Sequence, residues 1–189
     1  MSVKAFEVPK TVEASRLVAA QGDWPQHLGI TEAGTISTGL VRSAAGLGIL
    51  LAEGLGDTVR ISLSGDPLRE VDAAWQLLAA LELRQRGPVI VSCPTCARVK
   101  LNVEALADRV REATREVTVP LRLAVMGCEV NGPGEAREAD LGLCGSPAGY
   151  MLFSRGKVLR KFSDADPIEV FLEELRKLIE SGEADNGAG

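Results

Sequence analysis

The sequence predicts an α/β fold built from parallel strands joined by helices, and two observations predict it. Short apolar runs alternate with longer stretches of helical periodicity from the first residues onward. Such alternation is typical of parallel strands with crossover helices. Gly34 and Gly65 follow the ends of two of the runs, where α/β folds place their ligand-binding loops. With 189 residues, 46% of them hydrophobic, the chain is long enough for one large domain or two small ones.

Residues 1–86 contain three strand–helix pairs, of which the third strand is rich in β-branched residues. The predicted strands are residues 2–5, 27–31 and 58–64. The predicted helices are residues 9–21, 41–53 and 68–85. The last helix begins after Asp66-Pro67, a pair that suits a helix cap and first turn. A break at Arg86-Gly87-Pro88 follows, and we place a domain boundary there.

Residues 87–180 form the second predicted domain. Its predicted strands are residues 89–92 and 121–126, followed by a hairpin over residues 150–162 that turns at residues 154–157. Its predicted helices are residues 103–116 and a last helix that starts near Asp166-Pro167 and runs to residue 179. Residues 181–189 are small and polar, so we expect a disordered tail there.

Charge and hydropathy limit the classes of partner. The net charge of −5 argues against broad attraction to nucleic acid or to an anionic membrane. No apolar run approaches the ~20 residues that span a bilayer, and the first ten residues do not resemble a secretory signal. We therefore expect a cytoplasmic protein. Because thiols stay reduced in that compartment, its four cysteines favour metal or redox chemistry over disulfides.

Three cysteines follow two of the predicted strands. Cys93 and Cys96 form a C-x-x-C pair directly after the first, and Cys128 comes soon after the second. If the two strands are neighbours and parallel, their carboxyl ends bring the three sulfurs close together. The C-x-x-C pair alone also fits a thioredoxin-like redox pair. The third cysteine favours a zinc or iron–sulfur site, which normally has four protein ligands.

Two residues are candidates for the fourth ligand. Cys144 lies in a predicted loop, residues 142–149, and would complete a site made of thiolates alone. Glu135 follows Cys128 in a loop with three glycines that can fold back on the metal. A carboxylate matches cluster iron less well than a thiolate, so it would exchange more readily and leave room for a substrate oxygen. A solvated Glu135 and a buried, apolar Cys144 fit the sequence equally well.

A polar stripe in the first domain suggests an anion site. Arg60 and Ser62 alternate with apolar residues and so share one face of a strand, and a guanidinium with a hydroxyl suits a phosphate. An internal ion pair of Arg60 is the alternative that the sequence alone favours. Lys4 and Glu32 stand at strand ends, where the catalytic groups of barrels gather. His27 begins a strand, and we expect it to be structural.

Six segments between residues 2 and 136 carry a resemblance to a known family. They are SVKA at 2–5, HLGITEAG at 27–34, SAAGLGILLAEGLGDTVRISLSGDP at 43–67, LRQRG at 83–87, SCPTCAR at 92–98 and VMGCEVNGPGEA at 125–136. In this order they resemble the bacterial 4-hydroxy-3-methylbut-2-enyl diphosphate synthase family of non-mevalonate isoprenoid biosynthesis. The resemblance implies the C-terminal strands and helices of a TIM-type (β/α)8 barrel, incomplete here, over residues 1–86. A small α/β iron–sulfur domain over residues 87–180 would follow it.

The resemblance also implies a role for each candidate residue. The ligands of a [4Fe-4S] cluster would be Cys93, Cys96, Cys128 and Glu135, with Cys144 outside the set. The substrate-binding residues would be Lys4, Arg60, Ser62 and Asn131. Glu32 and Glu135 would be catalytic, Glu32 by helping to protonate the departing hydroxyl and Glu135 by yielding its iron to a substrate oxygen.

The implied activity is an oxidoreductase reaction. It converts 2-C-methyl-D-erythritol 2,4-cyclodiphosphate to 4-hydroxy-3-methylbut-2-enyl diphosphate with electrons from flavodoxin or ferredoxin, and full-length members are expected to be homodimers. Because an eight-stranded barrel needs about 250 residues, either this is a partial chain or a second polypeptide supplies the remaining strands. We expect the chain to be inactive alone. The alternative function is a zinc-stabilised binding module without redox activity.

Overall fold

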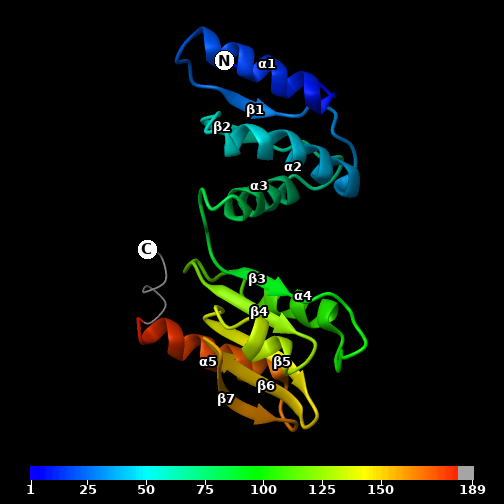
Figure 1. The fold of residues 1–189 in the computed structure, drawn as a ribbon, viewed down its shortest axis with the longest axis vertical. Helices are drawn as coiled ribbons and strands as arrows, with labels where there is room; N and C mark the ends of the chain where they lie inside the picture. The colour runs from blue at the N-terminus through cyan, green and yellow to red at the C-terminus, as the bar shows by residue number, and fades with distance from the viewer. Residues whose placement is uncertain (183–189) are drawn as a thin grey trace. The chain divides into compact units, whose positions relative to one another are not determined.

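The structure, a computed structural model, describes residues 1–182 without the side chain of Glu135. It is an α/β structure, as the sequence predicts, and it divides into two compact units, Met1–Gln85 and the residues from Arg86 on (Figure 1). Residues 181–182 form a turn after the last helix, and the rest of the predicted tail lies outside the described residues. Within the described residues, no helix is both long enough and apolar enough to cross a bilayer.

Residues 1–85, all of them described, form the first unit. Its elements are α1 (Val8–Gln21), β1 (His27–Gly29), α2 (Ile36–Ala52), β2 (Thr58–Arg60) and α3 (Leu68–Ala80). Strands β1 and β2 pair in parallel, with Leu28 opposite Val59. Leu28 packs with Leu47 and Leu50 of α2 in a core that excludes water from all three side chains.

Two of the predicted strands of this unit are wrong in extent. Residues 2–5 are not a strand. Two backbone hydrogen bonds join this segment to β1 and the residues after it, from His27 N to Met1 O and from Thr31 N to Ala5 O, and no continuous ladder forms between them. Strand β2 ends at Arg60 instead of residue 64. Beyond it, the N–H of Leu63 donates to the carboxylate of Glu70 at 2.7 Å rather than to a neighbouring strand. A side-chain bond thus takes the place of a ladder bond at Leu63. Backbone pairing returns only as an isolated parallel bridge between Thr35 and Ser64, where the N–H of Ser64 donates to the carbonyl oxygen of Gly34 at 2.9 Å.

Two helix boundaries also differ from the prediction. Helix α2 begins at Ile36, before the predicted residue 41, although Gly39 has a low helix propensity. The side chain of Leu63 fills the space that a Cβ at Gly39 would need, so tertiary packing outweighs propensity there. Helix α3 ends at Ala80 instead of residue 85, because Glu82 adopts a left-handed backbone with φ 55°.

The second unit is a five-stranded sheet with helices on it. Its elements are β3 (Val89–Ser92), α4 (Val103–Ala113), β4 (Arg122–Met126), the π-helical turn η1 (Asn131–Glu135), β5 (Leu141–Ser146), β6 (Gly149–Ser154), β7 (Lys157–Phe162) and α5 (Pro167–Glu180). The strand order is β3-β4-β5-β6-β7, in which β3, β4 and β5 are parallel and the last two pairings are antiparallel. As predicted, α5 begins at Asp166-Pro167, where the Asp166 carboxylate accepts from Ile168 N at 2.8 Å.

The two faces of this sheet are covered differently. Helices α4 and α5 cover one face, where a large apolar core is centred on the fully buried Leu143 and Phe171. The other face carries a smaller cluster, the η1 cluster, whose residues are Ala124, Met126, Ala136, Ala139, Cys144, Met151 and Phe153. Because side chains alternate along a strand, neighbours such as Leu143 and Cys144 lie on opposite faces.

Strand β5 is absent from the sequence prediction, which placed a loop over residues 142–149. Every residue of β5 is buried, so it shows no alternation of polar and apolar side chains. The β6–β7 hairpin is confirmed, with a tighter turn than predicted. Ser154 pairs with Lys157, and only Arg155 and Gly156 lie between them, at φ 47° and 77°. Two positive φ angles in a two-residue loop are typical of a type I′ turn.

Two glycines of α2 give a matched pair of variants. A Cβ at Gly46 would come within 2.7 Å of the buried Ile30, whereas a Cβ at Gly48 would meet nothing within 4 Å. Gly48→Ala is expected to raise the free energy of unfolding by about 0.5–1 kcal/mol, because alanine loses less backbone entropy. Gly46→Ala is expected to lower it by about 1–3 kcal/mol through overpacking. Urea unfolding measures both, and equal shifts would contradict this packing.

Candidate functional site

The carboxyl ends of β3 and β4 lie side by side, because the strands pair in parallel with Ser92 opposite Val125. Cys93 follows β3 directly, and Cys128 comes just after β4. The backbone N–H of Gly127 donates to Sγ of Cys93 at 3.1 Å. The first thiol therefore lies against the residue that precedes Cys128. The condition set in the sequence analysis, that these two strands are neighbours and parallel, is therefore met.

The loop that carries Cys96 folds over the same glycine. The N–H of Lys100 donates to the carbonyl oxygen of Gly127 at 2.8 Å. On its third side Gly127 meets Val99, whose side chain would lie 2.8 Å from a Cβ at this position. A side chain at residue 127 would push this loop away, so the close approach requires glycine. Cys96 itself is exposed, whereas Cys128 is buried.

The donor set of this edge fits a soft metal. Cys93, Cys96 and Cys128 offer thiol sulfur, the ligand that zinc and iron–sulfur clusters prefer. Among the described side chains, no three of His, Cys, Asp or Glu lie close enough together to hold one metal ion. The side chain of Glu135 is outside that description. The case for a metal site therefore rests on the thiol donors and on the hydrogen bonds that join Cys93 and the C-x-x-C loop to Gly127.

Between Cys128 and Glu135 the predicted loop is one π-helical turn, η1. The N–H of Ala136 donates to the carbonyl oxygens of Asn131 at 3.1 Å and Gly132 at 3.2 Å. The Cys128 thiol donates to Oδ1 of Asn131 at 3.7 Å. Single π turns occur often at functional sites. This one ties the backbone of Glu135 to that of Cys128 through a short, hydrogen-bonded segment.

Cys144 lies in the middle of β5, opposite Met126, and not in the predicted loop. It is fully buried, and a Cβ at Gly132 would come within 2.7 Å of its sulfur, so η1 lies directly on it. Burial, followed by negative charge at Cys128 and Glu129, raises the pKa of the Cys144 thiol to about 12. Its surroundings are those of a small apolar core residue.

Phe153 completes the support under η1, and the sequence analysis did not identify it. A Cβ at Gly142 would overlap its ring, and a Cβ at Gly132 would approach the ring to 3.2 Å. The absence of side chains at these two glycines lets the fully buried ring pack between β5 and η1. The glycine in η1 was a visible signal, but its partner could not be recognised without β5.

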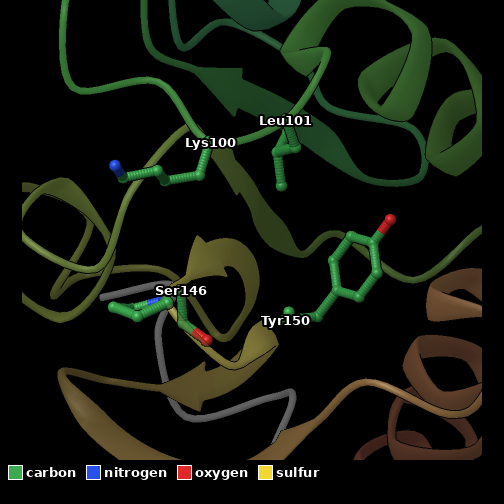
Figure 2. Close-up of a pocket in the computed structure, with 6 residues that line it drawn as sticks. Lys100, Leu101, Ser146 and Tyr150 are labelled. Carbon is green, nitrogen blue, oxygen red and sulfur yellow. The ribbon is translucent and has the colours of Figure 1, made fainter.

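Two surface pockets open in this unit. The larger, about 460 Å³, is lined by Lys100, Leu101, Ser146, Pro147, Gly149 and Tyr150 (Figure 2). Figure 2 shows the Lys100 and Tyr150 side chains directed away from each other. A smaller pocket of about 220 Å³ borders Cys93 and the start of the C-x-x-C loop. No thiol lines the larger pocket, whereas Cys93 lines the smaller one.

Lys4 and Arg60 form a group of cations in the first unit, with the imidazole of His27 beside them. Burial and then the charge of Arg60 lower the pKa of Lys4. Burial, and then the charges of Lys4 and Arg60, lower the pKa of His27. His27 Nδ1 lies 2.8 Å from Oγ1 of Thr58, a contact that fits its expected structural role. Because like charges disfavour one another here, an anion bound to this group would be stabilised.

Ser62 and Glu32 lie near this group along the chain. Ser62 is half-buried just beyond β2, and Glu32 is exposed just beyond β1 with φ 54°, which is uncommon for a residue other than glycine. Within residues 1–182, no hydrogen bond or ion pair joins Glu32 to Lys4, Arg60 or Ser62. Nor does any described carboxylate form an ion pair with Arg60, so the internal ion pair considered for it is not formed.

Comparison with known proteins gives consistent matches. The family model for the GcpE TIM-barrel domain matches residues 1–75, and that for the GcpE protein C-terminal domain matches residues 89–177. The chain is 50% identical over 179 residues to the 4-hydroxy-3-methylbut-2-en-1-yl diphosphate synthase (flavodoxin) of Geobacter sulfurreducens, covering 95% of this chain and 51% of that protein. It is 49% identical to the protein of the same name from Dehalococcoides mccartyi and 45% identical to that from Thermodesulfovibrio yellowstonii. Each of these alignments covers 94% of this chain and 51% of the relative.

The chain thus spans about half the length of these curated relatives. The two family models follow each other in chain order and together cover most of the sequence. The alignments extend over nearly all of it at close to one identical residue in two. The chain therefore belongs to the GcpE protein family.

Proposed function

We propose that this chain is the rear part of a 4-hydroxy-3-methylbut-2-enyl diphosphate synthase. Residues 1–86 are assigned to a partial barrel and residues 87–180 to an iron–sulfur domain. The complete protein would open the ring of 2-C-methyl-D-erythritol 2,4-cyclodiphosphate reductively. The observation that carries the proposal is the meeting of the Cys93 and Cys128 segments at Gly127, in a member of this family.

Cys93, Cys96, Cys128 and Glu135 are the proposed ligands of a [4Fe-4S] cluster. Gly127 holds the sulfur of Cys93 beside the Cys128 segment, and η1 ties Glu135 to the same segment. When bound, the cluster supplies single electrons and a Lewis-acidic iron. A carboxylate is the hardest donor of the four, so Glu135 marks the exchangeable position. Cys144 supports η1 from below and is not a ligand in this proposal.

Lys4, Arg60 and Ser62 are proposed to bind the diphosphate of the substrate. The lowered pKa of Lys4 reflects its burial and the repulsion from Arg60. A bound phosphate would offset that repulsion and accept hydrogen bonds from the guanidinium and the hydroxyl. Glu32 is proposed to hold a proton on its carboxyl for the departing hydroxyl. Asn131, which contacts Cys128, is proposed to bind substrate beside the cluster.

The partners follow from the same proposal. A flavodoxin or a ferredoxin would deliver the electrons, and the relatives carry flavodoxin in their names. We propose a homodimer for the full-length form. Strands β1 and β2 make a two-stranded sheet that does not close into a barrel. We therefore expect activity only when the remaining barrel strands are supplied.

Anaerobic reconstitution with iron and sulfide tests the metal assignment. We expect about four irons and four sulfides per chain and a brown absorption that bleaches on reduction. Elemental analysis and the visible spectrum measure both. A colourless chain that retains one zinc through anaerobic purification would support the zinc-stabilised binding module instead.

Substitution of the proposed ligands separates Glu135 from Cys144. Glu135→Ala is expected to keep most of the iron, held by three thiolates, but to change the electron paramagnetic resonance spectrum of the reduced cluster. Cys144→Ala is expected to leave both iron content and spectrum unchanged, because its sulfur only packs against η1. Cys128→Ala, the positive control, should lose iron. Loss of iron in Cys144→Ala with no effect of Glu135→Ala would establish a site made of thiolates alone.

Inorganic pyrophosphate probes the proposed diphosphate site without the cluster. We expect Lys4→Met to weaken its binding about tenfold, the equivalent of one charge-assisted hydrogen bond. Lys10→Met is the matched control, because Lys10 is exposed on α1 and ion-paired with Glu7 at 2.6 Å. Isothermal titration calorimetry measures both affinities. Equal affinities of the two variants would show that pyrophosphate binds elsewhere.

A further inference from the structure

We propose that one edge of the second unit is a docking surface for an acidic electron-transfer protein. This surface, the basic edge, consists of Arg137, Lys157, Val158 and Lys161. The inference rests on the proposed function, in which a donor protein reduces the cluster, and it adds where that donor binds.

The basic edge is in direct contact with the segment that carries η1. At the hairpin turn, a Cβ at Gly156 would come within 3.3 Å of Cβ of Arg137 and 3.4 Å of the carbonyl oxygen of Pro133. Toward the other end of β7, Nζ of Lys161 lies 3.7 Å from the carboxylate of Glu129, the residue after Cys128. Strand β7 therefore runs alongside the segment that begins just after Cys128 and ends just beyond Glu135.

Val158 and Lys161 lie on the same face of the sheet as η1. Val158 pairs with Phe153 and Lys161 pairs with Met151. Paired residues of neighbouring strands present their side chains to the same face. Both Phe153 and Met151 belong to the η1 cluster. Since β7 is the outermost strand, Val158 is 49% exposed there, and Lys161 is exposed as well.

Charge is segregated in this unit. Residues 141–163 contain four basic side chains and no acidic one, in a chain whose net charge is −5. Acidic side chains instead gather on α5, at Glu169, Glu173 and Glu174. Helix α5 packs on the opposite face of the sheet.

Two of the four cations have a carboxylate partner, Arg155 with Asp140 and Lys161 with Glu129. Arg160 pairs with Leu152 and Lys157 with Ser154, so these two side chains start from the other face of the outermost strand. The hairpin therefore carries an excess of positive charge along its outer strand, beside the segment that holds η1.

A donor that surrounds its redox group with carboxylates fits this surface. Complementary charge can raise association rates by about 10- to 1,000-fold at low salt. Electron-transfer complexes bury little area, so one exposed apolar side chain with cations around it is an adequate centre. In each encounter one electron leaves the reduced flavin of the donor and enters the cluster. The donor is thus oxidised by one electron, and no bond is made or broken between the proteins.

Two double variants with equal loss of charge test the proposal. Lys157→Gln/Lys161→Gln removes two of the three positive charges of the basic edge. Arg115→Gln/Arg176→Gln removes two exposed charges elsewhere in the unit, just after α4 and on α5. The measurement is stopped-flow reduction of the reconstituted full chain by reduced flavodoxin, as a ratio to its reduction by dithionite. We expect the ratio to fall about three- to tenfold at low salt in the first variant only. The difference should vanish at about 0.5 M salt.

Calorimetry with oxidised flavodoxin and the cluster-free full chain separates this proposal from the proposed function. If the chain takes up no cluster, the proposed function fails, and weaker binding by the first double variant alone still supports the docking surface. If the chain takes up a cluster and both double variants give equal rate ratios and equal affinities, the docking surface is wrong. The docking surface is also wrong if neither the unsubstituted chain nor either double variant binds flavodoxin detectably and the rate ratios do not differ.

Discussion

The parallel pairing of β3 with β4 is the constraint on which the candidate metal site depends. With Ser92 opposite Val125, both strands end at one edge, and the N–H of Gly127 reaches the sulfur of Cys93. The carbonyl of the same glycine holds Lys100, so both backbone polar groups of one residue position the C-x-x-C loop. An antiparallel pairing would send the two cysteine segments to opposite edges and leave no common site.

The sequence analysis treated this pairing as a condition, because each predicted strand is a short apolar run with a cysteine at or near its end and a helix lies between the two strands. It did not predict β5, whose six residues are all buried and contain two glycines and a serine. A strand buried on both faces has no period to detect. The error in β5 put Cys144 in a loop and hid the Phe153 ring that lies under η1. The proximity of the Cys93 and Cys128 segments was therefore predictable, whereas the surface that supports η1 was not.

In the first unit, the residue pattern predicted which side chains share a face, whereas only the structure shows which charged groups lie close together. Alternation placed Arg60 and Ser62 on one face, and that expectation needed only the local period. The pKa values of Lys4 and His27 are lowered by burial and by the charge of Arg60. The pairing of β1 with β2 brings His27 and Arg60 into the same part of the sheet. No periodicity in the sequence reports such proximity. The early end of β2 has the same origin, because the Glu70 carboxylate takes the N–H of Leu63.

Net charge and local charge have separate consequences in this chain. The net charge of −5 determines how the chain interacts with other charged molecules at long range, where only the total charge matters. Screening limits each charge to about 8–10 Å at physiological salt, so small groups of cations act independently of that sum. Within residues 1–182, one such group lies around Lys4 and Arg60 and another lies along β7. A net negative charge is therefore compatible with both proposals, anion binding in the first unit and docking of an acidic protein on the second, even though Glu129 lies beside Lys161.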